Sequence, residues 1–265
     1  MNTRLTKEDQ AMIKEAKGNK VSGPIYSEDG LRLLKVLGNP EYLEVKDGVK
    51  AICDEACQGL DNLQDVVLPA SVIDLGTRAF ASCIKLFKIT IPGIEFIGTE
   101  SFAHCENLKE IALPETLGKI WEGAFADCKA LEEINIPSHL KIIDKSAFRN
   151  SGLKSLNIVI SEDCKCWIYD RSFASCKHLE SVYLNKNVKI LERMAFAGCT
   201  SLKTIEFEQP SLTCCAGEIN ATMLIGAAHL SKRLSCQRTS TTLTQTSISE
   251  PMSLLSLRLA TSIVF

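Results

Sequence analysis

A phenylalanine recurs along this chain about every 23 residues, within the pattern Ala-Phe-x-x-Cys-x-x-Leu. Successive copies are separated by 22, 23, 23, 25 and 23 residues. A fixed period of about 20–50 residues is typical of a solenoid of stacked units. Because one such unit is too short to bury its own apolar face, it must pack against its neighbours. The repeated residues are Phe80, Phe102, Phe125, Phe148, Phe173 and Phe196.

Other positions of the repeat are equally regular. A leucine follows each phenylalanine by six residues in most copies, and a small residue, alanine or serine, always precedes it. A cysteine follows by three residues in every copy except one, which has Ser151. An earlier copy has Cys57 in place of phenylalanine, which gives seven copies over about residues 49–209. The cysteines three residues after phenylalanine are Cys83, Cys105, Cys128, Cys176 and Cys199.

The second half of each copy, Leu-x-x-Ile-x-Ile, alternates apolar and polar residues and predicts a short, half-buried strand. A proline ends this run in four copies, because proline cannot donate to a strand ladder. The Ala-Phe-x-x-Cys segment is too short for an independent helix and predicts one or two helical turns on the outer wall. We therefore expect a repeat solenoid: a stack of short parallel strands, about 4.8 Å apart.

These residues resemble the BspA-type leucine-rich repeat family, whose units read Leu-x-x-Ile-x-Ile-Pro and then Ile-Gly-x-x-Ala-Phe-x-x-Cys. The resemblance covers about residues 49–209, and Ile97-Gly98 keeps the Ile-Gly pair of the family. It implies a curved leucine-rich repeat solenoid of the kind found on the surfaces of bacteria and parasitic protozoa. It also implies adhesion to host proteins or to other cells, with no catalytic residues.

Charge and hydropathy exclude some classes of function. The net charge is −2, from 30 basic and 32 acidic residues, so nothing indicates nucleic-acid binding. Residues 1–9 lack the apolar core of a secretory signal, and no stretch approaches the roughly 18 apolar residues of a membrane span. The sequence as written predicts a soluble, cytoplasmic chain, whereas the family resemblance implies the cell surface or secretion. The oligomeric state is left open.

The N-terminal region precedes the repeats. Residues 1–19 form a charged segment, in which Lys7 to Lys17 predicts a short helix with Thr6 as its N-cap. Residues 20–48 predict a hairpin with Asp29-Gly30 in the turn. Because a solenoid needs a cap over its first apolar layer, we assign that task to residues 20–48.

The C-terminal region differs abruptly in composition. Residues 211–265 contain 17 Ser or Thr among 55 residues and carry a net charge of +2, whereas residues 1–210 carry −4. We expect residues 210–265 to be a non-repeat tail of low order. One explanation is a natural Ser/Thr-rich tail, and the preferred one is a shift of reading frame near codon 210.

Several residue patterns suggest chemistry but favour a simpler interpretation. The repeated cysteines are expected to be small buried apolar residues rather than disulfides or metal ligands. Cys164-x-Cys166 has no second cysteine pair nearby, and His104 and His178 lie on opposite sides of their cysteines. No phosphate-binding glycine motif is present. We expect no enzyme activity, no metal and no cofactor.

The polar positions eight and ten residues after phenylalanine point away from the core in the predicted strands. They form two columns, and solenoids use such a surface, called here the strand face, to bind partners. A mixed surface of this kind suits a folded protein or an extended peptide. We predict a protein-interaction or adhesion module; the alternatives are an intracellular scaffold and a fragment of a disrupted repeat-protein gene. The candidate binding residues are Asp65, Lys88, Thr90, Glu110, Glu133, Asn135, Asn157, Ser181, Tyr183 and Glu206.

Overall fold

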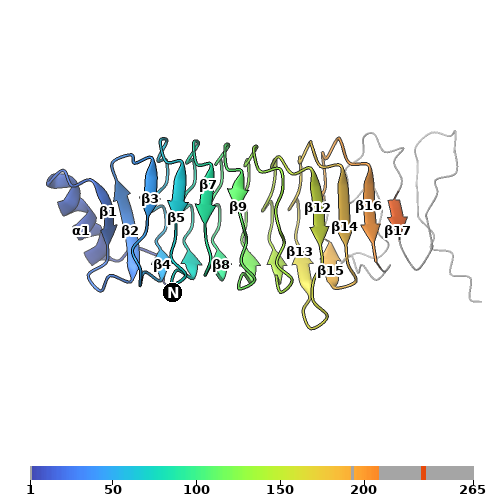
Figure 1. Cartoon of the computed structure of the whole chain (residues 1–265), viewed down its shortest axis with the longest axis horizontal. Helices are drawn as coiled ribbons and strands as arrows, with labels where there is room; N and C mark the ends of the chain where they lie inside the picture. The colour runs from blue at the N-terminus through green and yellow to red at the C-terminus, as the bar shows by residue number, and fades with distance from the viewer. Residues whose placement is uncertain (1, 192–193, 209–233, 237–265) are drawn as a thin grey trace, which may run out of the picture.

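The computed structural model describes residues 2–191, 194–208 and 234–236, which form one long stack of turns of chain (Figure 1). Most repeats contribute a short strand to each of two walls. One wall is a single nine-stranded sheet, in which every pair is parallel except the first. In spatial order its strands are β1 (Gly23–Tyr26), β2 (Arg32–Leu37), β4 (Ala51–Ile52), β6 (Asp74–Leu75), β8 (Phe96–Ile97), β10 (Lys119–Ile120), β11 (Ile142–Ile143), β13 (Cys166–Ile168) and β15 (Val188–Leu191).

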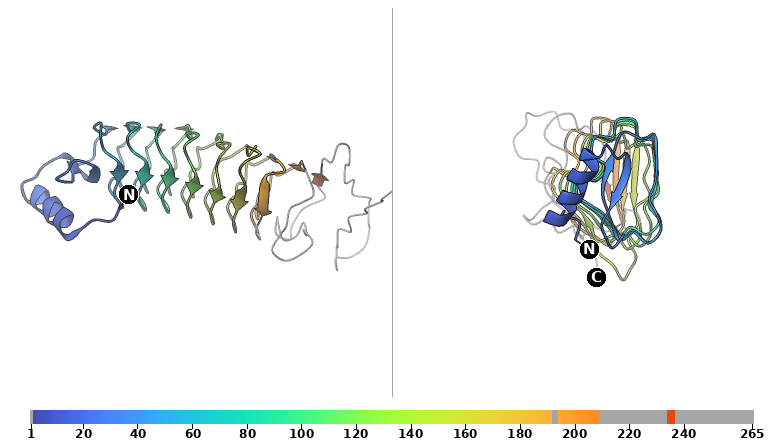
Figure 2. Two further views of the ribbon diagram at one scale, coloured as in Figure 1. Left: turned by 90° about the horizontal axis from the view of Figure 1, so that it is seen from below. Right: turned by 90° about the vertical axis from the view of Figure 1, so that its left-hand side faces the viewer.

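The other wall is the strand face that the Leu-x-x-Ile-x-Ile runs predict. It consists of two separate four-stranded parallel sheets rather than one. The first contains β3 (Tyr42–Glu44), β5 (Asp65–Val67), β7 (Lys88–Thr90) and β9 (Glu110–Ile111). The second contains β12 (Ser155–Ile158), β14 (Ser181–Leu184), β16 (Thr204–Phe207) and β17 (Leu234–Cys236). The expected repeat solenoid of leucine-rich type, built from stacked parallel strands, is confirmed, and Figure 2 shows its turns lying side by side.

The aromatic side chains form a continuous column inside the stack. All six repeat phenylalanines are fully buried. Their rings stack with centroids 5.1–5.6 Å apart and interplanar angles of 1–13°. Offset parallel stacking of this kind adds stability beyond the burial of apolar area. The column thus fixes the register of each repeat against the next.

The segment around each phenylalanine, called here the Phe wall, contains hydrogen-bonded turns rather than the expected short helical turns. Residues two before and two after phenylalanine are left-handed, for example Arg78 at φ 54° and Ser82 at φ 60°. Their amides and that of Phe80 donate to carbonyl oxygens of the next repeat, at 2.7–2.8 Å. A helix would direct these N–H groups back along its own axis. The Phe wall therefore joins repeats to one another.

The N-terminal region covers the first end of the stack. Helix α1 (Lys7–Gly18) begins with a capping box, in which Thr6 accepts from the Asp9 amide and the Asp9 carboxylate accepts from the Thr6 amide. Ile13 packs against Leu34 of β2, and Asp9 forms an ion pair with Arg32 at 2.9 Å. Strands β1 and β2 form an antiparallel hairpin that opens the nine-stranded sheet. Gly30 adopts φ 72° in its turn, a conformation that glycine adopts without steric cost.

Two features of the strand face differ from the sequence expectation. The strand expected around Ile134 and Ile136 is absent, and this gap divides the face into its two sheets. The second difference is β17, which pairs with β16 although it lies in the tail where we predict no repeat. Apart from β17, the tail lies outside the described residues. Its low order therefore stays a prediction.

Candidate functional site: the strand face

The ten candidate residues all lie on the outer surface of the strand face, and none of them is buried. The strand register divides eight of them into two groups, and the other two lie between these groups. Asp65, Lys88, Thr90 and Glu110 are neighbours on β5, β7 and β9. Asn157, Ser181, Tyr183 and Glu206 are neighbours on β12, β14 and β16. Glu133 and Asn135 lie between the two sheets, on the segment without a strand.

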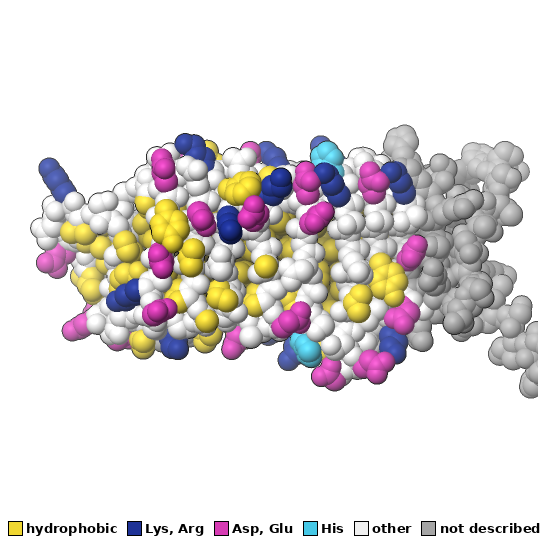
Figure 3. Space-filling model, viewed as in Figure 1, with side chains coloured by type: hydrophobic (Ala, Val, Ile, Leu, Met, Phe, Trp, Pro, Cys, Tyr) yellow, Lys and Arg dark blue, Asp and Glu magenta, His cyan; other side chains and the backbone are white. Residues whose placement is uncertain are grey.

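The charges on the first group are largely solvated. Lys88 Nζ lies 3.6 Å from Glu110 Oε2, and both side chains are about half exposed. An exposed pair of this kind contributes little to folding stability, because water and salt screen it. Asp65 Oδ1 is buried without a hydrogen-bond partner, beside Lys88 in the strand register. Charged and apolar side chains are thus mixed on this face (Figure 3), and Lys88 and Glu110 remain exposed on it.

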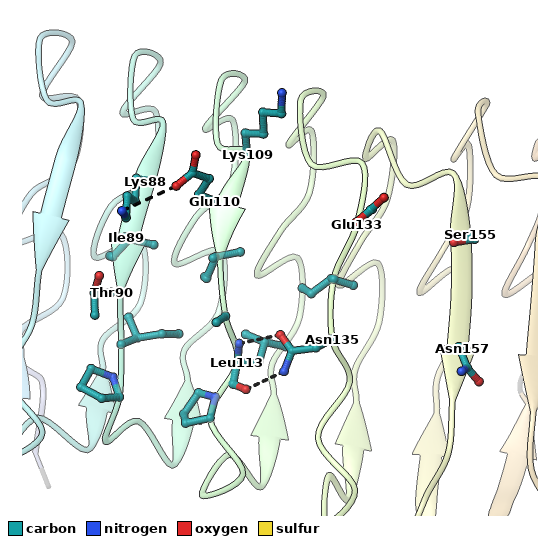
Figure 4. Close-up of a pocket in the computed structure, with 16 residues that line it drawn as sticks. Lys88, Ile89, Thr90, Lys109, Glu110, Leu113, Glu133, Asn135, Ser155 and Asn157 are labelled. Atoms are coloured by element: carbon teal, nitrogen blue, oxygen red, sulfur yellow. Dashed lines mark hydrogen bonds and ion pairs between the residues drawn. The ribbon is translucent and has the colours of Figure 1, made fainter.

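A groove of about 870 Å³ crosses this face where the sheet is interrupted. It extends from β7 across β9 and the Glu133 segment to β12 (Figure 4). Its floor contains Ile111 and Ile134, which are only partly buried. Its rim carries Lys88, Glu110 and Glu133. Polar groups around a partly apolar floor are typical of a ligand-binding surface.

Asn135 replaces the missing strand ladder at one end of the groove. Its Oδ1 accepts from the Leu113 amide at 2.9 Å, and its Nδ2 donates to the Leu113 carbonyl at 2.7 Å (Figure 4). In the regular part of the face, Leu68 N instead donates to the Thr90 carbonyl, so the main chains pair directly. A short amide side chain can compete with main-chain ladders in this way. The two bonds take the place of direct main-chain pairing at Leu113.

The cysteines are held inside the stack, away from the strand face. The nine cysteines whose side chains the structure describes are free and buried. Burial raises the pKa of Cys83 to about 12 and the pKa of Cys105 well above its usual value. Such thiols are poor nucleophiles, because the thiolate is the reactive form.

The other patterns that the sequence singles out do not assemble a reactive centre in the part of the chain that is described. His104 Nδ1 lies 3.7 Å from Asp127, a carboxylate that Arg149 and Asn150 also contact. Cys164 Sγ donates to the His139 carbonyl at 3.5 Å. Among the described residues, no cluster of His, Cys, Asp or Glu is arranged to hold a metal ion. No described helix has the length and apolar character needed to cross a membrane.

Comparison with known protein families assigns the repeat to one of them. The model of the family described as "BspA type Leucine rich repeat region" matches residues 50–166 and 166–219, in six copies. The chain belongs to the BspA-type leucine-rich repeat family. This membership confirms the resemblance seen in the sequence and suggests a protein-interaction or surface-protein module. A search of the curated proteins finds no match.

Solved structures of leucine-rich repeat proteins resemble this one. A leucine-rich repeat protein from Bacteroides ovatus is 26% identical, with a TM-score of 0.50 over 70% of this chain and 46% of the other. The T. pallidum leucine-rich repeat protein is also 26% identical, with a TM-score of 0.49 over 71% of this chain and 83% of the other. This chain therefore spans just under half the length of the Bacteroides ovatus protein.

Sequence reasoning placed Asn135 on the face but missed its contact with Leu113. A second asparagine, Asn185, makes the same pair of hydrogen bonds to Ile160, at 3.2 Å from Oδ1 to the amide and 2.7 Å from Nδ2 to the carbonyl. Asparagine at the outer positions of a strand run is the available signal, because its amide competes with main-chain pairing. The signal is incomplete, since Asn157 occupies the same column and its strand is intact.

Proposed function

We propose that the chain is a non-enzymatic protein-interaction module that binds a macromolecular partner through its strand face. The observation that carries the proposal is the exposure of the ten candidate residues on one continuous side of the stack. Membership of the BspA-type family supports the proposal, because solenoids of this class present extended binding surfaces.

Adhesion at a cell surface is the form of this function that the family resemblance favours. A solenoid binds over many small contacts, and a face that carries the exposed Tyr42, the half-buried Tyr183 and several charges suits a protein partner. An intracellular scaffold would use the same face. Fractionation of the cells that make the native protein separates these two forms of the proposal.

A fragment of a disrupted repeat-protein gene is a second candidate. The observation that favours it is the abrupt rise in Ser and Thr after residue 210. Translation of the two other reading frames of the gene tests it. Continuation of the Ala-Phe-x-x-Cys pattern in either frame supports the fragment, and its absence from both frames rejects it.

The test of the proposed function is a pull-down with two matched variants. The first replaces Lys88, Glu110, Glu133 and Tyr183 of the strand face by alanine. The control replaces Glu95, Glu122, Lys145 and Tyr169 by alanine. These four residues are of the same types as the first four and lie close to the ends of strands of the nine-stranded sheet. We expect the first variant to lose the partner that the wild type and the control retain. Equal recovery of every partner by all three proteins would reject the strand face as the binding surface.

A further inference from the structure

The nine-stranded sheet is covered at its first end, where helix α1 lies (Figure 2). Ile13 of the helix packs against Leu34 of β2 and against Cys53, which follows β4. The segment before the helix crosses the same strands, since the Thr3 carbonyl accepts from the Asp54 amide at 2.9 Å. Further along, from β8 to β13, the outward side chains of the sheet keep part of their surface exposed.

These outward side chains form two columns, called here the aromatic patch. The isoleucines between the two columns, Ile97, Ile120, Ile143 and Ile168, are fully buried, so the residues before and after them point outward. The first column contains Phe96, Lys119, Ile142 and Trp167. The second contains Gly98, Trp121, Asp144 and Tyr169. Both tryptophans of the chain thus lie in the patch, and aromatic residues of this kind are enriched in protein interfaces.

Two charged side chains border the second column on adjacent turns. Glu122 follows Trp121, and Lys145 follows Asp144. Both side chains are exposed, and neither forms an ion pair with a described residue. The patch therefore has an available carboxylate on one turn and an available ammonium group on the next.

A two-fold axis parallel to the strands, between β10 and β11, makes the aromatic patch complementary to itself. This axis reverses the order of the turns, so β10 faces β11 of a second copy and β8 faces β13. Gly98, which has no side chain, then lies opposite the ring of Tyr169 of the second copy. Trp121, whose indole N–H can only donate, lies opposite the Asp144 carboxylate of the second copy.

The charges select this axis over the other face-to-face arrangement. With the axis parallel to the strands, Glu122 lies opposite Lys145 of the second copy, and symmetry makes the contact twice. An axis along the stack, centred on the same two columns, would instead place Lys145 opposite Lys141 of the second copy. Like charges that face each other across an interface disfavour it, whereas opposite charges fix its register.

We propose that the aromatic patch joins two copies of this chain face to face, with Glu122 of each copy against Lys145 of the other. The strands of the two sheets then run in the same direction, as in aligned sheet packing. The patch spans four strands, about 14 Å from the first to the last. The interface is therefore small, and we expect a dissociation constant on the order of 10 μM. The patch contains no residue of the strand face, so the dimer leaves the ten candidate residues outside its interface.

Sedimentation velocity of the full chain, from about 1 to 200 μM, tests the proposal. The first two variants are Glu122→Lys and Lys145→Glu, each of which creates two like-charge contacts across the two-fold axis. The matched control is Glu133→Lys, which reverses an exposed carboxylate on the strand face. The decisive sample is an equimolar mixture of Glu122→Lys and Lys145→Glu, because a dimer with one copy of each has opposite charges at both contacts.

We expect the wild type and Glu133→Lys to dimerise alike. Glu122→Lys and Lys145→Glu should each weaken self-association about tenfold or more, and their mixture should recover it. A wild type with the mass of one chain at every concentration would overturn the proposal. Dimers that persist in both single variants, or a mixture that stays as weak as its components, would equally reject this interface.

The dimer is independent of the proposed function, and the two can fail separately. The alanine control of the pull-down lacks Glu122, Lys145 and Tyr169, so we expect it to be monomeric and to keep the partner of the strand face. In a cross-linking experiment, a product of two copies has twice the mass of the chain and is thereby distinguished from an adduct with another protein.

Discussion

The thiol of Cys105 donates a hydrogen bond to the carbonyl oxygen of Phe80, with 3.1 Å between Sγ and O. The same bond, at the same length, joins Cys83 to Cys57, Cys128 to Phe102, Cys176 to Phe148 and Cys199 to Phe173. In these five repeats a small side chain thus donates to a carbonyl oxygen of the preceding repeat. The recurrence of cysteine follows from both packing and hydrogen bonding, because a thiol is a small apolar group with a weak donor.

Replacement of Cys105 tests this contact. Cys105→Val removes the donor while it keeps a similar apolar volume, and we expect it to lower the free energy of unfolding by about 1–2 kcal/mol. Cys105→Ser keeps a donor at this position and should cost less than valine. Urea unfolding of the three proteins checks the order. A valine variant as stable as the wild type would show that packing alone selects cysteine here.

The phenylalanine column should be sensitive at its centre. Phe125 lies between Phe102 and Phe148, with ring centroids 5.3 and 5.1 Å away. Phe125→Ala removes both stacking partners' contacts and leaves a cavity, so we expect a loss of about 3–5 kcal/mol in the free energy of unfolding. Phe125→Leu keeps much of the volume and should lose less. Thermal unfolding of the alanine variant at the wild-type temperature would contradict the assigned register.

Close packing of successive turns predicts a contrast between two glycines. A Cβ added at Gly93 would collide with the carbonyl oxygen of Ala70 in the preceding repeat, whereas one added at Gly118 would lie 3.8 Å from the Glu95 oxygen. We expect Gly93→Ala to cost about 1–3 kcal/mol and Gly118→Ala to be close to neutral. The midpoint of urea unfolding measures both. Equal midpoints for the two variants would mean that neighbouring turns are less tightly packed than this.

Buried thiols predict a loss of stability at alkaline pH. Burial raises the pKa of Cys83 to about 12, whereas the pKa of a thiol in the unfolded chain is about 8.5. Between these values the unfolded chain releases a proton that the native state keeps. The free energy of unfolding therefore falls as pH rises, by up to about 1.4 kcal/mol per pH unit for each such thiol, and is unaffected below about pH 8.

Urea unfolding at pH 7.5 and pH 10 measures this dependence, with Cys83→Ala as the control. The variant lacks one titrating thiol and should lose less stability between the two pH values than the wild type does. An identical loss in both proteins would assign the alkaline effect to other groups.

The sequence predicted the stack well because its signals are local and repeated. The period, the inward position of each phenylalanine and the outward position of residues such as Lys88 all follow from side-chain patterning. The nine-stranded sheet was not foreseen, since its strands near Ile97 and Ile120 are two residues long. Runs this short carry no alternation from which a strand could be inferred.

The turns of the Phe wall and the gap between β9 and β12 in the strand face could not be predicted from the sequence, for a different reason. The left-handed residues two after phenylalanine include Ser82, His104, Asp127 and Asn150, and Asp, Asn and His are types enriched in that conformation. Their common feature is visible only once the positions are aligned. At the gap between β9 and β12, the Asn135 side chain makes the hydrogen bonds to Leu113 that main-chain pairing makes elsewhere on the face, so the gap depends on which partner Leu113 takes. Composition alone does not decide it.

Site-specific photo-crosslinking tests the central claim most directly. A photoreactive benzoylphenylalanine is placed at Thr90 on the strand face or at Glu122 beside the nine-stranded sheet, both exposed positions. Each protein is irradiated with the partner recovered by the wild type. We predict a covalent adduct from the Thr90 position and none from Glu122. An adduct from Glu122 alone, or equal adducts from both, would contradict binding through the strand face.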